Sequence, residues 1–156
     1  MEPIPDFRFT VQPEWVDYNG HMNMGFYMVA FDVVATDPFY EWLGIGEDYV
    51  ARRRRSVFTL AANIDYLAEL FVGDEARIVT RLVDWDRKRI HYFHTMYDAA
   101  DTVVATNELL GINVDMDTRA TVDFDPELQA RLGELASAHD LEPRHDRVGR
   151  VLGIRR

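Results

Sequence analysis

One segment of this sequence is apolar over most of a helix circumference, and it constrains the fold more than any other feature. From about 23 to 35 the apolar side chains recur in a helical pattern, so we expect a helix that is buried nearly all round. A helix of this kind needs other elements packed around it. Because most of the predicted strands follow it, the expected class is α+β, with a curved antiparallel sheet wrapped around the helix.

Segments of alternating polarity predict the strands. One short strand precedes the helix at 7–11, and four longer ones follow it. We expect these four at 58–66, 75–85, 89–97 and 103–116. In the first of the four, one face carries Phe58, Leu60, Ala62, Ile64 and Tyr66. The tight link at 86–88 predicts a hairpin between the second and the third.

Local signals set the ends of the helices. Asn23 is the expected N-cap of the central helix. The stretch 36–38 should break or kink that helix, because proline disfavours helix in the residue before it, and a short helical piece then ends at Gly44. A last helix is expected over about 126–139, with Asp125 as its N-cap. The polar and basic residues that follow it should form a loosely attached tail.

Composition narrows the setting. The 156 residues include no cysteine, which excludes disulfides, thiolate zinc sites and a cysteine nucleophile, and suits a reducing compartment. The acidic start at 1–6 is not a signal peptide, and no apolar run approaches the ~20 residues that span a bilayer. We therefore expect a cytoplasmic protein.

The formal net charge is −10, which argues against general binding to nucleic acids or membranes. The basic residues are nevertheless clustered, at 52–55, at 87–89 and in the tail. Such a cluster is either solvated surface or a place to hold a small polyanion.

Polar groups gather directly before the apolar helix, where Asp17, Asn19, His21 and Asn23 fall within seven residues around a tight Asn-Gly turn. The start of a helix offers unpaired backbone N–H groups and the positive end of a dipole, which can hold a developing oxyanion. A carboxylate beside it can attack a carbonyl or activate water. Alternatively, Asp17 and Asn19 only cap the turn, and His21 is an ordinary histidine. The catalytic interpretation requires the Asp17 carboxylate to face a ligand-sized hollow.

The segment resembles the signature of the 4-hydroxybenzoyl-CoA-thioesterase-like family of the hotdog superfamily. The matching positions are Asp17, Gly20, His21, Met22, Asn23 and Tyr27. The segments 64–67 and 72–74 are similar to the second strand of that family and the turn after it, and the resemblance covers about 5–125. It implies a hotdog domain over 1–125, with 126–156 as the C-terminal helix and basic tail of the same domain.

Within this family, the segments 13–23, 88–91 and 149–154 are most similar to the betainyl-CoA thioesterase type. The stretch 59–63 departs from that type, because it carries alanines where more polar positions are expected. A quaternary ammonium acyl group needs an aromatic box or a carboxylate. The aromatic candidates are Tyr18, Trp15 and Tyr66.

The resemblance implies a role for each site residue. Asp17 is the nucleophile or the general base of acyl-CoA hydrolysis, and backbone N–H groups near 20–24 polarise the carbonyl. The other implied residues are Gly20, His21, Met22 and Asn23 for positioning, Tyr27 beneath the site, Trp15, Asn63 and Tyr66 for substrate binding, and Arg87, Lys88 and Arg89 for the CoA phosphates. Coenzyme A is part of the substrate, with no other cofactor. A homodimer or homotetramer is implied, with the CoA channel between protomers.

Alternatives remain at this stage. One is a hotdog module that binds an acyl-CoA without hydrolysing it, and another is a hydratase or dehydratase on the same fold. No metal is expected: Asp17 with His21 lacks a third ligand, and His91 and His94, three apart on a strand, face opposite sides. Glu108 is either a partly buried carboxylate supporting the site or a sign of an exposed edge strand, and we favour the edge. The run Arg52–Arg55 is a solvated loop or a CoA contact.

Overall fold

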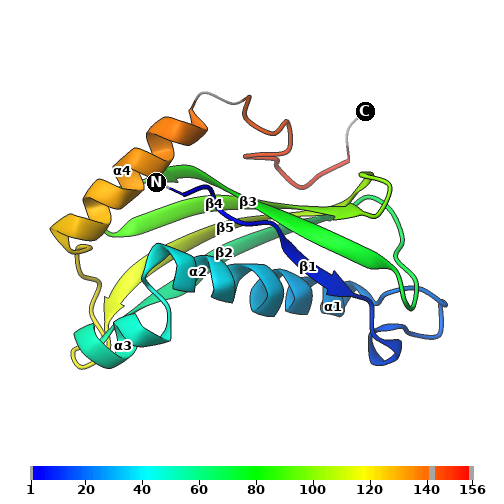
Figure 1. The fold of residues 1–156 in the computed structure, drawn as a ribbon, viewed down its shortest axis with the longest axis horizontal. Coiled ribbons are helices and arrows are strands. Elements are labelled where there is room, and N and C mark those ends of the chain that lie inside the picture. Colours follow the sequence, from blue (N-terminus) through cyan, green and yellow to red (C-terminus); the bar gives the residue numbers. More distant parts are fainter. Residues whose placement is uncertain (1, 141–142, 155–156) are drawn as a thin grey trace.

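The computed structural model describes residues 2–140 and 143–154, and the described chain is organised by one five-stranded antiparallel sheet (Figure 1). The strand order is β1-β3-β4-β5-β2. The strands are β1 (Phe7–Thr10), β2 (Arg55–Tyr66), β3 (Glu75–Trp85), β4 (Arg89–Asp98) and β5 (Val103–Asp115). Each of the five predicted strands is therefore present, and the predicted hairpin joins β3 to β4.

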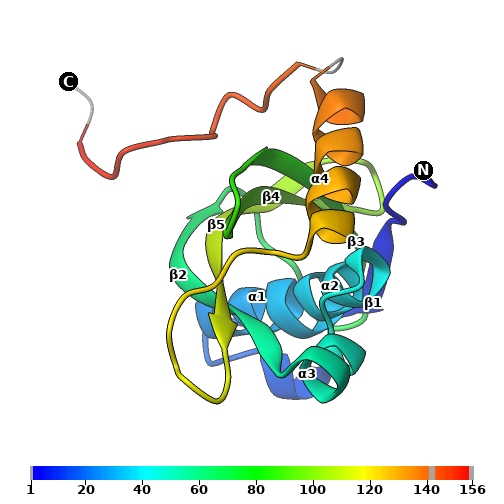
Figure 2. The same ribbon diagram turned by 90° about the vertical axis from the view of Figure 1, so that its left-hand side faces the viewer.

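A long helix lies against one face of this sheet, in three consecutive stretches: α1 (Met24–Val29), the π-helical η2 (Ala30–Thr36) and α2 (Asp37–Leu43). The shorter elements are the 3-10 turn η1 (Pro13–Trp15), α3 (Glu47–Arg53) and α4 (Pro126–His139). Figure 2 shows the long helix below the curved sheet, and Figure 1 shows α4 at the end of the sheet where α2 lies. Leu128, Leu132 and Leu135 of α4 share a buried cluster with Phe39 and Leu43 of α2. No helix among the described residues is long and apolar enough to cross a bilayer.

The helix is not broken at Pro38, although a break was one of the two outcomes predicted there, the other being a kink. Pro38 lacks an N–H and would clash with the carbonyl four residues before it in a regular α-helix. The π-helical stretch η2 directly precedes it and changes the hydrogen-bond register there, so the chain remains helical to Leu43. The helix ends as predicted at Gly44, whose φ of 86° is the left-handed conformation that glycine adopts easily.

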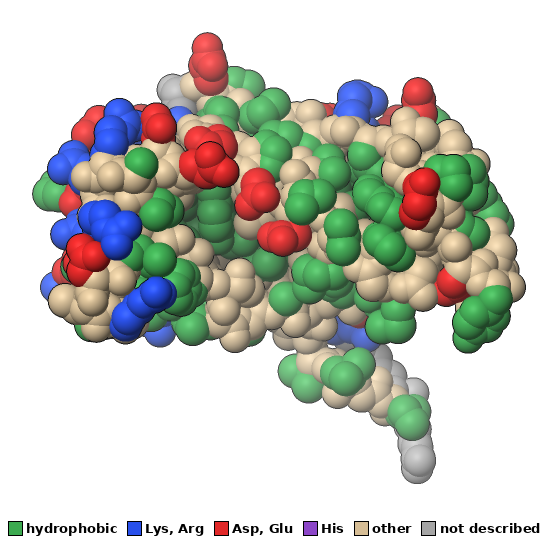
Figure 3. Space-filling model, turned by 90° about the horizontal axis from the view of Figure 1, so that it is seen from below, with side chains coloured by type: hydrophobic (Ala, Val, Ile, Leu, Met, Phe, Trp, Pro, Cys, Tyr) green, Lys and Arg blue, Asp and Glu red, His purple; other side chains and the backbone are tan. Residues whose placement is uncertain are grey.

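The prediction that this helix is buried nearly all round is wrong for the single chain. The sheet covers one side of it, where Tyr27, Phe31 and Phe39 are buried. On the other side, Val29 and Val33 are 39% and 51% exposed. Figure 3 shows the helix-bearing face of the molecule, with hydrophobic side chains spread across it and most of the basic ones gathered at one end. The sheet curves around half of the helix and leaves an apolar stripe uncovered.

Strand β2 also departs from the prediction, because a bulge at Leu60 shifts its pairing with β5 by one residue. Phe58 lies opposite Ile112, whereas Ala62 lies opposite Leu109. Leu109 and Ile112 are three residues apart on one strand, so they face opposite sides of the sheet. Phe58 therefore does not share a face with Ala62, and the predicted single apolar face is wrong. The outer edge of β2 pairs with no other described strand.

The tail is not loosely attached over 143–150, because it crosses the face of the sheet that points away from the long helix. Arg147 and Arg150 each donate to the carboxylate of Asp65, with N–O distances of 3.0 and 3.1 Å. The backbone N–H of Gly149 donates to Glu108 at 2.9 Å. Beyond this strap, Val151, Leu152 and Ile154 are more than 80% exposed.

Candidate active site

Asp17 lies in the tight turn between η1 and α1. Its Oδ1 accepts a hydrogen bond from the backbone N–H of Asn19 at 2.8 Å, and its Oδ2 accepts one from Nδ2 of Asn23 at 2.6 Å. The turn closes by a bond from the N–H of Gly20 to the carbonyl of Asp17, and Gly20 has a φ of 82°. The predicted Asn-Gly turn is therefore present.

These bonds set the charge state of the carboxylate. The side-chain amide of Asn23 lowers the pKa of Asp17, and the N–H of Asn19 lowers it further, because both stabilise the ionised form. Asp17 is therefore a carboxylate at neutral pH. Each of its oxygens can still accept a second hydrogen bond, or one of them can act on an electrophile.

The start of α1 supplies a free donor close to this carboxylate. Asn23 is the N-cap, as predicted, since its Oδ1 accepts the N–H of Gly25 at 2.9 Å while its Nδ2 holds Asp17. The N–H of Phe26 bonds to the carbonyl of Asn23. Across the described residues, no hydrogen bond occupies the N–H of Met24. One side-chain amide thus fixes both an anionic oxygen and a helix end with an unused N–H.

A hollow of about 300 Å³ lies beside this helix start. It is lined by His21, Met22, Met24, Tyr27, Tyr66, Leu67, Ala68 and Glu69. The hydroxyl of Tyr66 donates to the carbonyl of Met24 at 3.1 Å, and that of Tyr27 donates to the carbonyl of Ala68 at 3.2 Å. The two rings meet edge to face with centroids 5.4 Å apart. The end of β2 and the loop after it are thereby tied to the first turn of α1.

The structure brings some of the predicted site residues together and leaves others apart. His21, Met22, Tyr27 and Tyr66 line the hollow. Asp17 does not line it, so one chain alone does not meet the requirement of the catalytic interpretation that this carboxylate face a ligand-sized hollow. Asp17 is connected to the lining residue Met24 through Asn23, which binds the carboxylate and precedes Met24 in the chain. One Asp17 oxygen also accepts the N–H of Asn19, as the turn-capping alternative predicts.

Three of the predicted substrate contacts lie elsewhere. Trp15 stacks on Phe26 with ring centroids 5.8 Å apart, so it supports the helix start from outside the hollow. The side chain of Tyr18 is 97% exposed. Asn63 is on the face of the sheet away from the helix, where its Nδ2 donates to the carbonyl of Arg150.

The basic turn Arg87–Arg89 stands at the opposite end of the sheet from Asp17. The N–H of Met22 donates to the carbonyl of Leu70, so the start of α1 lies at the Glu75 end of β3, whereas the turn follows its Trp85 end. At roughly 3.3 Å per residue, the 11 residues of β3 span about 33 Å. Arg89 pairs with Asp86, and Arg87 with Asp123. One chain does not bring this turn to Asp17.

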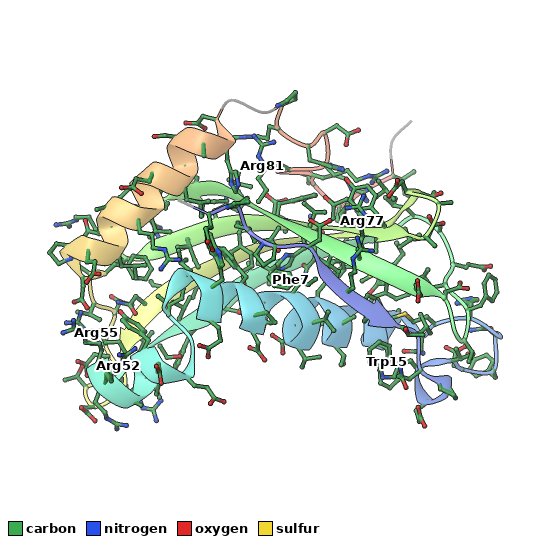
Figure 4. The ribbon with its side chains drawn as sticks, in the orientation of Figure 1. Phe7, Trp15, Arg52, Arg55, Arg77 and Arg81 are labelled. Carbon is green, nitrogen blue, oxygen red and sulfur yellow. The ribbon has the colours of Figure 1, made fainter. Side chains whose placement is uncertain are left out.

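The run Arg52–Arg55 lies at that same far end, as Figure 4 shows for Arg52 and Arg55 against Trp15. It is not a loop: Arg52 and Arg53 end α3, Arg54 is the left-handed C-cap, and Arg55 begins β2. All four side chains have carboxylate partners, which are Asp48, Asp125, Asp117 and Asp125 in that order. Asp125 is therefore engaged by arginines, and its side chain does not cap α4.

The remaining candidates are structural. The prediction that Glu108 marks an edge strand is wrong, since β5 is an interior strand and Glu108 accepts from Nε2 of His91 at 2.7 Å. His94 faces the other side of the sheet, as predicted, between the hydroxyls of Thr36 and Thr80. Burial lowers the pKa of His94 to about 3. Among residues 2–140 and 143–154, no group of three His, Asp or Glu is placed to hold a metal ion.

Sequence reasoning missed Glu69 and Met24 as lining residues. Glu69 lies two residues after the segment 64–67, which resembles the family. This proximity is the one feature of the sequence that could have identified it as a lining residue. Met24 occupies the first helical position after the N-cap, where a free N–H is expected.

Comparison with known proteins shows the family to which this chain belongs. A model of the thioesterase-like superfamily matches residues 11–132. A betainyl-CoA thioesterase of Pseudomonas aeruginosa is 35% identical over 97% of this chain and 95% of its own length. An L-carnitine dehydrogenase/betainyl-CoA thioesterase of Ruegeria pomeroyi is also 35% identical, over 88% of this chain and 28% of that longer protein.

Among solved structures, a Staphylococcus aureus protein in complex with CoA superimposes with a TM-score of 0.89 and 25% identity. The match covers 96% of this chain and 94% of that one. Together with the family match, it confirms the hotdog fold predicted from the sequence.

Proposed function

The chain belongs to the thioesterase-like superfamily and is a thioester hydrolase, and we propose that it hydrolyses an acyl-CoA by means of Asp17, as nucleophile or as general base. The proposed substrate is betainyl-CoA or another short-chain acyl-CoA, because both similar proteins named above carry betainyl-CoA in their names. Coenzyme A takes part as the leaving half of the substrate.

The observation that carries this proposal is the double role of Asn23. Its amide holds the ionised Asp17 on one side and caps the helix on the other, where the Met24 N–H is unused. A thioester carbonyl that accepts the Met24 N–H would be polarised at the positive end of the helix dipole. Asp17 is held by Asn23, directly before Met24 in the chain, and would then lie near the carbonyl carbon of the substrate.

Two routes follow from this arrangement. As nucleophile, Asp17 bonds to the carbonyl carbon and expels the CoA thiolate, and water then hydrolyses the mixed anhydride to free acid and carboxylate. As general base, Asp17 takes a proton from a water that attacks the same carbon, and the thiolate leaves with that proton. The bond to Asn19 fits either route, because it occupies only one lone pair of Oδ1.

We propose that the complete site needs two chains. The open edge of β2 presents unpaired N–H and C=O groups, which suit antiparallel pairing with a second copy about a twofold axis. In such a pair the two sheets run in opposite directions. The α1 start of one protomer would then lie toward the Arg87–Arg89 turn of its partner, which supplies cationic groups for the CoA phosphates.

Asp17→Asn provides the test. It keeps the size and the turn-capping oxygen but removes the charge, so we expect kcat for thiol release from acyl-CoA esters to fall by about 10²- to 10⁴-fold. Asp98→Asn is the matched control, because the Oδ1 of Asp98 caps a turn in the same way, from the N–H of Ala100 at 2.9 Å.

Rapid-quench mass spectrometry of the peptide that contains Asp17 distinguishes the routes. Asp17 carries an acyl adduct in the nucleophilic route and none in the general-base route. A protein that binds acyl-CoA tightly but releases thiol no faster than the uncatalysed reaction, with or without the Asp17 carboxylate, would be the non-catalytic module instead.

A further inference from the structure

We propose that Glu69, together with Tyr27 and Tyr66, forms a subsite for a quaternary ammonium group on the acyl chain. This inference rests on the proposed function and names the residues that select the acyl group. The three side chains converge on the hollow of about 300 Å³ beside the start of α1.

The two tyrosines offer rings, and their hydroxyls are already used. Each hydroxyl donates to a backbone carbonyl, Tyr66 to Met24 and Tyr27 to Ala68, so neither is free to donate to a ligand. With their centroids 5.4 Å apart at an interplanar angle of 86°, the rings make two walls set at a right angle. Methylated ammonium groups have apolar surface and a diffuse positive charge, which aromatic faces attract at centroid distances up to about 6 Å.

The charge of the hollow favours a cation. Glu69 is the one carboxylate among its lining residues, and no lysine or arginine of the described chain lines it. The Glu69 side chain is 61% exposed, and its nearest basic neighbour is Nε2 of His21, at 3.6 Å. A carboxylate that has no ion-pair partner in the described chain other than this histidine can attract a quaternary ammonium group by its charge. Such a cation has no N–H and needs no hydrogen-bond acceptor.

The position of the hollow fits a short cationic acyl group. Met24 lines the hollow and carries the unused N–H proposed to bind the thioester carbonyl. In a betaine-type acyl group, one methylene separates the carbonyl carbon from the quaternary nitrogen. A carbonyl held at Met24 therefore directs the ammonium group into the space next to it, between Tyr66 and Glu69.

A second acidic hollow, of about 660 Å³, lies along α2 and α3, and its carboxylates include Glu41 and Glu47. It lies at the other end of the long helix, and neither Met24 nor the Tyr27–Tyr66 pair lines it. It therefore supplies the matched control for the effect of negative charge alone.

The experiment compares betainyl-CoA with 3,3-dimethylbutyryl-CoA, in which carbon replaces the quaternary nitrogen at the same shape. We expect the wild-type protein to prefer the charged ester in kcat/KM. Glu69→Gln should lower kcat/KM for betainyl-CoA by about tenfold and leave the neutral ester within about twofold. Tyr66→Phe should keep the preference, because it keeps the ring, and Tyr66→Leu should lose most of it.

Turnover of the neutral ester by each variant reports that the variant is folded. Glu47→Gln should change neither ester. The inference is overturned if Glu69→Gln lowers both esters equally or neither, or if Glu47→Gln alone removes the preference. A wild-type protein that hydrolyses the neutral ester without preferring the charged one also overturns it while leaving the thioesterase proposal intact. Activity on both esters that survives Asp17→Asn instead defeats the proposed role of Asp17.

Discussion

Asn23 serves both the proposed chemistry and the fold. Its side-chain Nδ2 donates a hydrogen bond to Asp17, and its Oδ1 accepts one from the start of α1. The donor half lowers the pKa of Asp17, and the acceptor half satisfies the N–H of Gly25. A change that removes only the donor half separates the two roles.

Asn23→Ser is that change, since a serine hydroxyl can still cap the helix but is too short to replace the amide at Asp17. The lowered pKa of Asp17 should rise toward its ordinary value, so the acid limb of the pH dependence of kcat/KM should move to higher pH. Asn23→Ala should show the same shift and also lose about 1 kcal/mol of unfolding free energy. Identical acid limbs in wild type and both variants would show that Asp17 is not the titrating group.

Residue-level prediction succeeded where contacts are local. Asp17, Asn23 and the turn between them lie within seven residues, so a motif can specify their geometry. Glu69 reaches the same hollow from more than forty residues away, in the loop that follows β2, a strand whose register changes at a bulge. No local pattern encodes that bulge. Asn63 was assigned to the site by the resemblance alone, whereas the alternation of β2 already puts it on the face opposite Tyr66, where it donates to the carbonyl of Arg150.

At the level of elements, the ion pairs that hold the strap 143–150 to β2 meet at Asp65. That carboxylate is 9% exposed and receives both Arg147 and Arg150. The Nε of Arg150 is buried without a hydrogen-bond partner. Both ion pairs between the strap and β2 thus depend on one side chain, and Asn63 adds a hydrogen bond to the carbonyl of Arg150.

Asp65→Asn should therefore lower the unfolding free energy by about 1–3 kcal/mol, because it leaves two partly buried guanidinium groups without their counter-charge. Asp101→Asn removes an exposed ion pair with Arg77 and should cost under about 1 kcal/mol. Urea unfolding measures both, and limited proteolysis should cut the tail of Asp65→Asn first. Equal stability of the two variants would mean that the ion pairs of Asp65 contribute no more than an exposed pair does.

Elements were predictable where turn residues mark their ends. Strands β3, β4 and β5 end within one residue of the predicted bounds, because short polar turns at 86–88 and 99–101 separate them. Helix α3 was missed, because its end lies in the arginine run that was interpreted as a loop. The passage of the long helix through Pro38 depends on a π-helical stretch that has no signature in the hydrophobic period.

At the level of the whole molecule, the single chain leaves two complementary surfaces uncovered. One is the open edge of β2, and the other is the exposed stripe of the long helix that includes Val29 and Val33. Both are features that a second copy would cover in the pairing proposed above.

Val33→Asp should shift the protein toward monomer and reduce thiol release in proportion, because a buried charge without a partner opposes association. Val72→Asp is the matched control, since Val72 is equally exposed, at 51%, but lies on the loop between β2 and β3. Analytical ultracentrifugation gives the state of each variant. A Val33→Asp protein that sediments like wild type would place the interface elsewhere.

The distance of about 33 Å along β3 has a consequence for inheritance as well as for chemistry. If the carboxylate end and the phosphate end of a site belong to different polypeptides, a defect in one copy spoils a pocket that its sound neighbour also helps to build. Two variants of the chain made in the same cell would then lower each other's activity. Substitutions near Asp17 and substitutions near the Arg87–Arg89 turn would affect the same shared sites.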